Sequence, residues 1–264
     1  MIQKEIKNSE FGDITLVTIV NDKGASVTLS TLGAGIVAIN VPDKTGRFDD
    51  VVLGYADPAD FMADGPCAGK VPGRFANRIA RGHFEIDGKA YSLAINNGPN
   101  ALHGGPTGFQ NRIWTLDKAE DDTVRFSYRA ADGEEGYPGN LLATATYRWT
   151  DDCTLSLALT AETDAPTVVN LTNHAYFNLA GHNSGSVLSH KLRLNASRYL
   201  PTDDTLIPTG ELAPVAGTPM DFTEPKELGQ DIRADFPALI YGKGYDNCWV
   251  VDGADGSLRT IAVL

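Results

Sequence analysis

Alternation of apolar and polar residues is the feature of this sequence that most restricts its fold. It runs through Val124–Arg129 (VRFSYR), and Leu155–Ala161 (LSLALTA) repeats it with an apolar residue at every second position. Successive side chains of a β-strand point to opposite faces of the sheet, so this pattern is typical of strands with one buried face. Leu142–Trp149 (LATATYRW), which lies between these two runs, carries a weaker form of the same pattern.

Turn signals separate the strand-like runs. The Asp87-Gly88 dipeptide lies between two short apolar-polar runs, which predicts a tight β-hairpin. A second cluster of turn residues, Asn21–Gly24, separates Ile14–Val20 from Ala25–Leu32. These signals indicate that neighbouring strands are joined directly and therefore run antiparallel.

Helical periodicity is almost absent. The best candidate is Asp57–Ala63, with Asp57 as the N-cap and Pro58 at the first helical position. Many short strands, 27 glycines and 14 prolines predict an all-β sandwich or barrel. No shift of composition, low-complexity linker or internal repeat divides the chain, so residues 1–264 are predicted to form a single domain.

Charge and cysteine content exclude several classes of protein. The 22 Lys and Arg residues are outnumbered by 34 Asp and Glu residues, and a net charge of −12 without any basic run argues against nucleic-acid binding. No apolar stretch is long enough to span a membrane, and the N-terminal residues lack the apolar core of a signal peptide. Three widely spaced cysteines favour reduced thiols over a disulfide framework, so we expect a cytoplasmic protein.

The sequence lacks complete motifs for a dinucleotide cofactor, a metal ion or a serine nucleophile. Gly33–Ala38 fits the dinucleotide pattern GxGxxA, but the β-branched residues that follow, ended by Pro42, leave no room for the helix that the motif needs. The histidines show no metal-ligand spacing, and the sequence contains neither a CxxC pair nor a GxSxG elbow. We therefore expect no cofactor and no metal site.

Three segments combine residue types that an ordinary strand or loop does not need: Gly73–Ile79 (GRFANRI), Asn100–Gly105 (NALHGG) and Asn170–Leu179 (NLTNHAYFNL). Forked donors such as Arg and Asn suit sugar hydroxyls, and aromatic rings suit sugar C–H faces. Taken one at a time, each segment has a plainer interpretation. The arginines could form surface ion pairs, His103 could cap a turn, and His174 could be a buried histidine with satisfied hydrogen bonds.

Taken together, these motifs resemble the aldose 1-epimerase (galactose mutarotase) family. Gly244–Asp246 (GYD) adds a fourth match, and the motifs occur in the family's order and approximate spacing over essentially the whole chain. The resemblance implies a large antiparallel β-sandwich, the galactose mutarotase-like supersandwich. It also implies that the protein interconverts the α and β anomers of aldohexoses such as galactose and glucose, with no cofactor and as a monomer or homodimer.

The resemblance also implies a role for each matching residue. His174 corresponds to the histidine that protonates the ring oxygen, and an imidazole suits that task because its ordinary pKa of about 6.5 lies near neutrality. His103 is the second expected catalytic residue and corresponds to a histidine that hydrogen-bonds the sugar and assists at the ring oxygen. The expected substrate-binding residues are Asn77, Arg78, Tyr176 and Asp246.

The family's general base is missing from the matched motifs. It is a glutamate in a later segment whose flanking pattern does not occur here, and Glu211, Glu224 and Glu227 lie in no matching motif. The chain also ends within an apolar, strand-like run, Ile261–Leu264. We therefore expect a sandwich that is incomplete at its C-terminal end. Three alternatives stay open: a non-catalytic sugar-binding protein on the same fold, a hexose-phosphate epimerase, and a purely structural β-domain.

Overall fold

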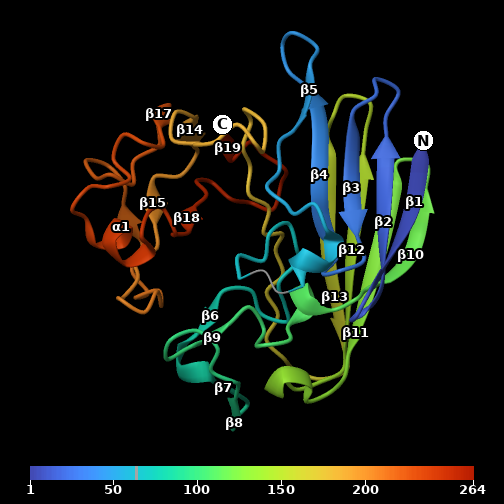
Figure 1. The fold of residues 1–264 in the computed structure, drawn as a ribbon. Helices are drawn as coiled ribbons and strands as arrows, with labels where there is room; N and C mark the ends of the chain where they lie inside the picture. The colour runs from blue at the N-terminus through green and yellow to red at the C-terminus, as the bar shows by residue number, and fades with distance from the viewer. Residues whose placement is uncertain (63–64) are drawn as a thin grey trace. The chain divides into compact units, whose positions relative to one another are not determined.

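The computed structural model describes residues 1–62 and 65–264, which form two compact units (Figure 1). The first unit is Met1–Ser184 and the second is Gly185–Leu264. The pairing between strands of the described sheets is antiparallel, which confirms the predicted all-β class. The single domain expected over residues 1–264 stays a prediction.

One sheet of the first unit is built from the N-terminal residues in the order β1-β2-β3-β4-β5. Val17 and Ile19 of β2 lie on the face that packs into the main apolar cluster, whereas Ile14 lies on the opposite face in a separate cluster with Leu32 and Phe61. The predicted turn at Asn21 forms as expected, because the Asn21 Oδ1 atom accepts the backbone N–H of Ala25 at 2.9 Å. The strands are β1 (Ile2–Ser9), β2 (Gly12–Val20), β3 (Ser26–Ser30), β4 (Gly35–Pro42) and β5 (Phe48–Asp50).

A second sheet of the first unit has the order β10-β11-β12-β13. Its strands are β10 (Thr115–Glu120), β11 (Thr123–Ala130), β12 (Leu141–Trp149) and β13 (Leu155–Thr163). Both alternating runs and the weaker one between them lie in this sheet, so all three strand predictions are confirmed. The inward face of β12 carries Ala143, Ala145, Tyr147 and Trp149, and each is buried.

The core of the first unit lies between these two sheets (Figure 1). Buried residues of both sheets, such as Val27 and Phe126, belong to one apolar cluster. Two polar tips cross this core: the Tyr147 hydroxyl donates to the carbonyl of Ala34 at 2.7 Å, and the Trp149 indole N–H donates to the carbonyl of Ala25 at 3.2 Å. Each large apolar side chain buried here contributes about 1.5–3 kcal/mol of hydrophobic stabilisation, so these side chains hold the two sheets together.

Short elements connect the sheets of the first unit. The predicted hairpin is confirmed, with Asp87 and Gly88 both at positive φ between two paired strands. The predicted helical segment forms one 3₁₀ turn at Pro58–Phe61, capped by Asp57, while Ala63 lies outside the described residues. The remaining elements are β6 (Arg78–Ile79), η2 (Ala80–Gly82), β7 (His83–Ile86), β8 (Lys89–Ser92), β9 (Ala101–Leu102), η3 (Phe109–Asn111) and η4 (Glu134–Gly136).

The second unit contains two three-stranded sheets of very short strands and the helix α1 (Pro237–Gly242). Its apolar cluster includes Tyr199, Val215, Met220 and Leu239. The strands are β14 (Lys191–Leu194), β15 (Arg198–Tyr199), β16 (Ala213–Pro214), β17 (Lys226–Glu227), β18 (Trp249–Val250) and β19 (Ala262–Val263). Among the residues described in either unit, no helix is long and apolar enough to cross a membrane.

Candidate functional site

Two of the predicted motifs lie against each other in the first unit, although they are about a hundred residues apart in the chain. The backbone N–H of His174 donates to the carbonyl of Lys70 at 2.9 Å. Further along, the N–H of Ala76 donates to the carbonyl of Asn170 at 2.8 Å. The segment that ends in GRFANRI therefore holds the NLTNHAYFNL segment through backbone hydrogen bonds, which fixes the position of His174.

Asn173 strengthens the hold on His174 from the preceding position. Its amide Nδ2 donates to the carbonyl of Gly69 at 2.6 Å and lies 3.3 Å from the hydroxyl of the buried Tyr147. Its Oδ1 accepts the N–H of Ala175 at 3.0 Å. The residues on both sides of His174 are thus attached to the backbone or to the core of the first unit.

A reciprocal pair of hydrogen bonds joins Asn77 to His103. The two residues flank the short pairing of β6 with β9. The N–H of His103 donates to the carbonyl of Asn77 at 3.0 Å, and the N–H of Asn77 donates to the His103 Nδ1 atom at 3.0 Å. Both residues have left-handed backbone conformations, with φ of 66° for Asn77 and 51° for His103, a region that Asn and His adopt more readily than most residues.

The glycines after His103 are needed for close backbone packing. Gly104 has a φ of 79°, and a Cβ atom there would overlap the carbonyl of Gly73. Thr107, which lies farther along the same loop, donates hydrogen bonds from its backbone N–H and its hydroxyl to the carboxylate of Glu135. This packing explains why the motif reads NALHGG, and it holds the loop that presents His103.

Arg78 is oriented by two amide side chains. Its Nε donates to the Oδ1 atom of Asn97 at 2.9 Å, and its Nη1 donates to the Oδ1 atom of Asn77 at 3.3 Å. The Nη2 group has no partner among the described residues. Arg78 is half-buried and Asn77 is exposed. The guanidinium is therefore fixed in direction and keeps donors for a ligand, as a hydroxyl-binding arginine requires.

Three predicted ring-bearing residues gather in the first unit. The rings of His103 and His174 meet edge to face, with centroids 5.3 Å apart. The ring of Tyr176 lies 5.1 Å from that of His174, and its hydroxyl lies 3.2 Å from the carbonyl of Pro66. Tyr176 is 39% exposed, so part of its side chain is accessible from solvent. The contacts thus join His103 to Asn77, Asn77 to Arg78, His103 to His174, and His174 to Tyr176.

The surroundings of His103 disfavour a charged imidazole. Burial, together with the charges of His174 and Arg78, lowers the pKa of His103 to about 4. His103 is therefore neutral at pH 7. The His174 ring nitrogens have no hydrogen-bond partner among the described residues of the first unit, so its imidazole is available to a ligand. An uncharged imidazole beside an accessible one suits hydrogen bonding and proton transfer at one sugar.

Asp246 lies in the second unit, where it is exposed between α1 and β18. Trp249, in β18, packs against Phe222 and Tyr245. Its indole N–H donates to the carbonyl of Met220 at 3.0 Å. The part that Asp246 takes in the site stays a prediction.

Sequence reasoning missed Asn97 and Asn173, which orient Arg78 and the His174 segment. Both belong to the amide-rich stretches that carried the motifs, and that repetition of amides was the available signal. It also missed the backbone N–H of Asn77, which leaves no trace in a sequence. Among residues 1–62 and 65–264, no cluster of His, Cys, Asp or Glu could hold a metal ion.

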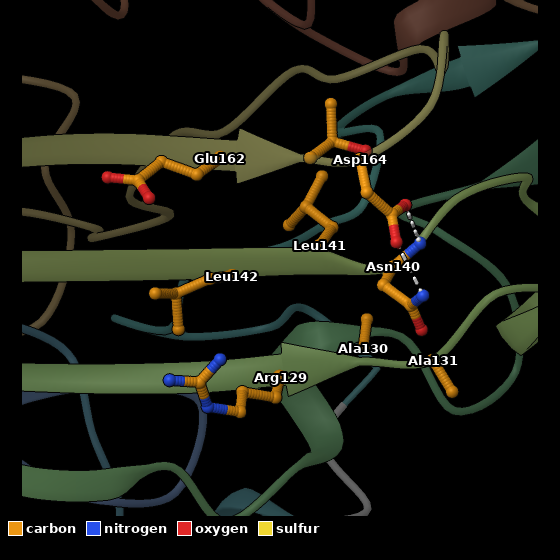
Figure 2. A pocket seen from close by; sticks show the side chains of 9 residues that line it. Arg129, Ala130, Ala131, Asn140, Leu141, Leu142, Glu162 and Asp164 are labelled. Atoms are coloured by element: carbon orange, nitrogen blue, oxygen red, sulfur yellow. Dashed lines mark hydrogen bonds between the residues drawn. The ribbon is translucent and has the colours of Figure 1, made fainter.

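A hollow lies elsewhere in the first unit, on the outer face of β11, β12 and β13 (Figure 2). It has a volume of about 540 Å³, and Arg129, Leu142 and Glu162 stand side by side on its three strands. At its end, the carboxylate of Asp164 accepts two hydrogen bonds from Asn140, at 2.8 and 2.7 Å. No histidine lines it, so it differs from the histidine cluster, the name used below for His103, His174, Tyr176, Asn77 and Arg78.

Comparison with known proteins decides the family. The family model described as aldose 1-epimerase matches residues 15–263. The chain belongs to the aldose 1-epimerase family. It is 47% identical to the galactose mutarotase of Sus scrofa over 207 residues, which cover 78% of this chain and 60% of that protein. It is 39% identical to the aldose 1-epimerase of Escherichia coli K12 over 247 residues, which cover 94% of this chain and 70% of that protein.

Solved structures confirm the predicted galactose mutarotase-like fold. The crystal structure of an aldose epimerase homologue from C. elegans superposes with a TM-score of 0.84 at 33% identity, covering 98% of this chain and 74% of that one. This aldose 1-epimerase family member spans 60–65% of the length of the galactose mutarotases of Sus scrofa and Homo sapiens.

Proposed function

We propose that this protein binds an aldohexose such as galactose or glucose at the histidine cluster and interconverts its α and β anomers. Family membership supports the reaction class. The observation that carries the proposal is the edge-to-face pair of His103 and His174, with Arg78 held beside Asn77 and Tyr176 beside His174. These groups supply hydrogen bonds to hydroxyls, an aromatic face and a proton donor in one unit.

The reaction needs an acid and a base. A base removes the proton of the C1 hydroxyl while an acid protonates the ring oxygen, so the C1–O5 bond breaks and an open-chain aldehyde forms. Rotation about the C1–C2 bond and reclosure then give the other anomer. His174 is the proposed acid, because its backbone is held on both sides, by the carbonyl of Lys70 and the N–H of Gly69, and its ring nitrogens have no hydrogen-bond partner among the first unit's described residues. Such a group typically contributes 10²–10⁴-fold to the rate.

The remaining residues bind the sugar in this proposal. Arg78 and Asn77 hold hydroxyl groups, and Tyr176 contacts a C–H face of the ring. Asp246 accepts hydrogen bonds from hydroxyls. The proposal assigns the role of base to no residue of this chain, because none of its glutamates lies in the family's base motif. Binding and turnover must therefore be measured separately.

Polarimetry of freshly dissolved α-D-galactose, paired with calorimetric titration of equilibrated galactose, tests this proposal. We expect the wild-type chain to bind galactose and to speed the approach to anomeric equilibrium. His174→Gln should lower the enzymatic rate at least about 100-fold. His83→Gln, at an exposed position of β7, is the matched control and should leave the rate unchanged.

The outcomes separate two functions. Binding without turnover would contradict the epimerase reaction and favour a sugar-binding protein on the same fold. Turnover that survives His174→Gln would contradict the role of His174. A chain that neither binds galactose nor speeds mutarotation would contradict the proposal as a whole.

A further inference from the structure

The backbone of Asn77 holds the His103 ring in a way that determines which ring nitrogen carries the proton. The ring nitrogen Nδ1 of His103 lies 3.0 Å from the backbone nitrogen of Asn77, and the backbone of His103 donates to the carbonyl of Asn77 in return. A backbone N–H is always a donor, so Nδ1 must act as the acceptor. A neutral imidazole whose Nδ1 accepts a hydrogen bond carries its proton on Nε2.

Placing a second proton on His103 is unfavourable for three reasons. Protonated Nδ1 could not accept the Asn77 N–H, and the half-buried ring would lose solvation as a cation. The cation would also lie beside His174 and near the guanidinium of Arg78, and the charges of both groups act against it. Burial and these charges lower the pKa of His103, which agrees with the geometry.

We propose that the backbone N–H of Asn77 locks His103 as the uncharged Nε2–H tautomer, so that His103 donates a hydrogen bond to a sugar oxygen and carries no proton through the reaction. His174 is then the only imidazole of the pair that gives and regains a proton. The part of this inference that concerns the sugar rests on the proposed function. The tautomer itself does not, because it follows from the hydrogen bonds of the unliganded chain.

The left-handed backbone of Asn77 is the device that aims its N–H at the ring. At φ of 66°, Asn is tolerated and glycine fits without strain, whereas a β-branched residue is strongly disfavoured. Asn77→Gly should therefore keep the lock on His103 while removing the side chain. Asn77→Val should disturb the lock.

Long-range ¹H–¹⁵N correlation spectra of the chain labelled in its histidines test the tautomer directly. His103→Gln identifies the His103 signals by their disappearance. We expect the wild-type His103 to show the neutral Nε2–H pattern from pH 8 down to pH 5, and Asn77→Gly to keep that pattern. A neutral Nδ1–H pattern, or a titration midpoint near the ordinary histidine value of about 6.5, would overturn the proposal whether or not the chain is active.

Galactose affinity tests the donor role. Gln places an amide N–H near the position of a histidine Nε2, so His103→Gln should bind galactose more tightly than His103→Ala. The pH dependence of wild-type binding should show no step from His103 between pH 5 and 8. Equal weakening by Gln and Ala, with the tautomer confirmed by the spectra, would overturn the donor role alone.

Discussion

Removing His103 should flatten the dependence of stability on pH. In the unfolded chain a histidine binds a proton below about pH 6.5, whereas in the folded chain the pKa of His103 is lowered to about 4. The unfolded state therefore binds more protons between these values, and the folded wild type loses stability as the pH falls through this window. With about 1.4 kcal/mol for each pKa unit, the loss that His103 causes amounts to about 2 kcal/mol at pH 5.

The assay compares urea unfolding at pH 8 and pH 5 for the wild type and His103→Gln. Trp114 and Trp149 are buried in the first unit, so a Trp249→Phe background makes fluorescence report on that unit alone. The wild type should lose about 2 kcal/mol more than His103→Gln between the two pH values. His83→Gln should lose as much as the wild type. An equal loss in His103→Gln and the wild type would refute the reasoning.

Two further changes test the packing that supports the site. Tyr147→Phe should destabilise the first unit by about 1–3 kcal/mol in urea unfolding, because the buried carbonyl of Ala34 loses its donor; an unchanged midpoint would count against that bond. Gly104→Ala should lower the stability by more than about 2 kcal/mol and weaken galactose binding, because the new Cβ overlaps the carbonyl of Gly73. Gly133→Ala, at a similar φ with open space around it, should cost only about 1 kcal/mol, and an equal cost at both positions would contradict the overlap.

The strands of the two sheets were predictable because the alternation of apolar and polar residues follows the alternation of buried and exposed faces. In β12, for example, every second residue packs inward while Thr144 and Thr146 occupy the other face. The short helix was less predictable. Asp57 and Pro58 marked its start correctly, but only one 3₁₀ turn follows, because capping residues report where a helix begins and not how far it continues.

The site was predictable only through motifs. Nothing in the alternation of residues places His103 beside His174, because their contact depends on loops that pair over long separations in the chain. The orientation of Arg78 by Asn97, and the bond from the Asn77 backbone to His103, depend on backbone angles that many sequences could adopt. A resemblance of motifs names such residues, but the hydrogen bonds that set their chemistry emerge only from the folded chain.

A titration of the histidine-labelled chain with D-galactose tests the central claim most directly. If the sugar binds at the histidine cluster, the signals of His103 and His174 should shift together and yield one dissociation constant. The signals of His83 and His190, which lie outside the cluster, should stay in place. Shifts confined to His83 or His190, or no shift of His103 and His174 up to the solubility limit of galactose, would contradict the account.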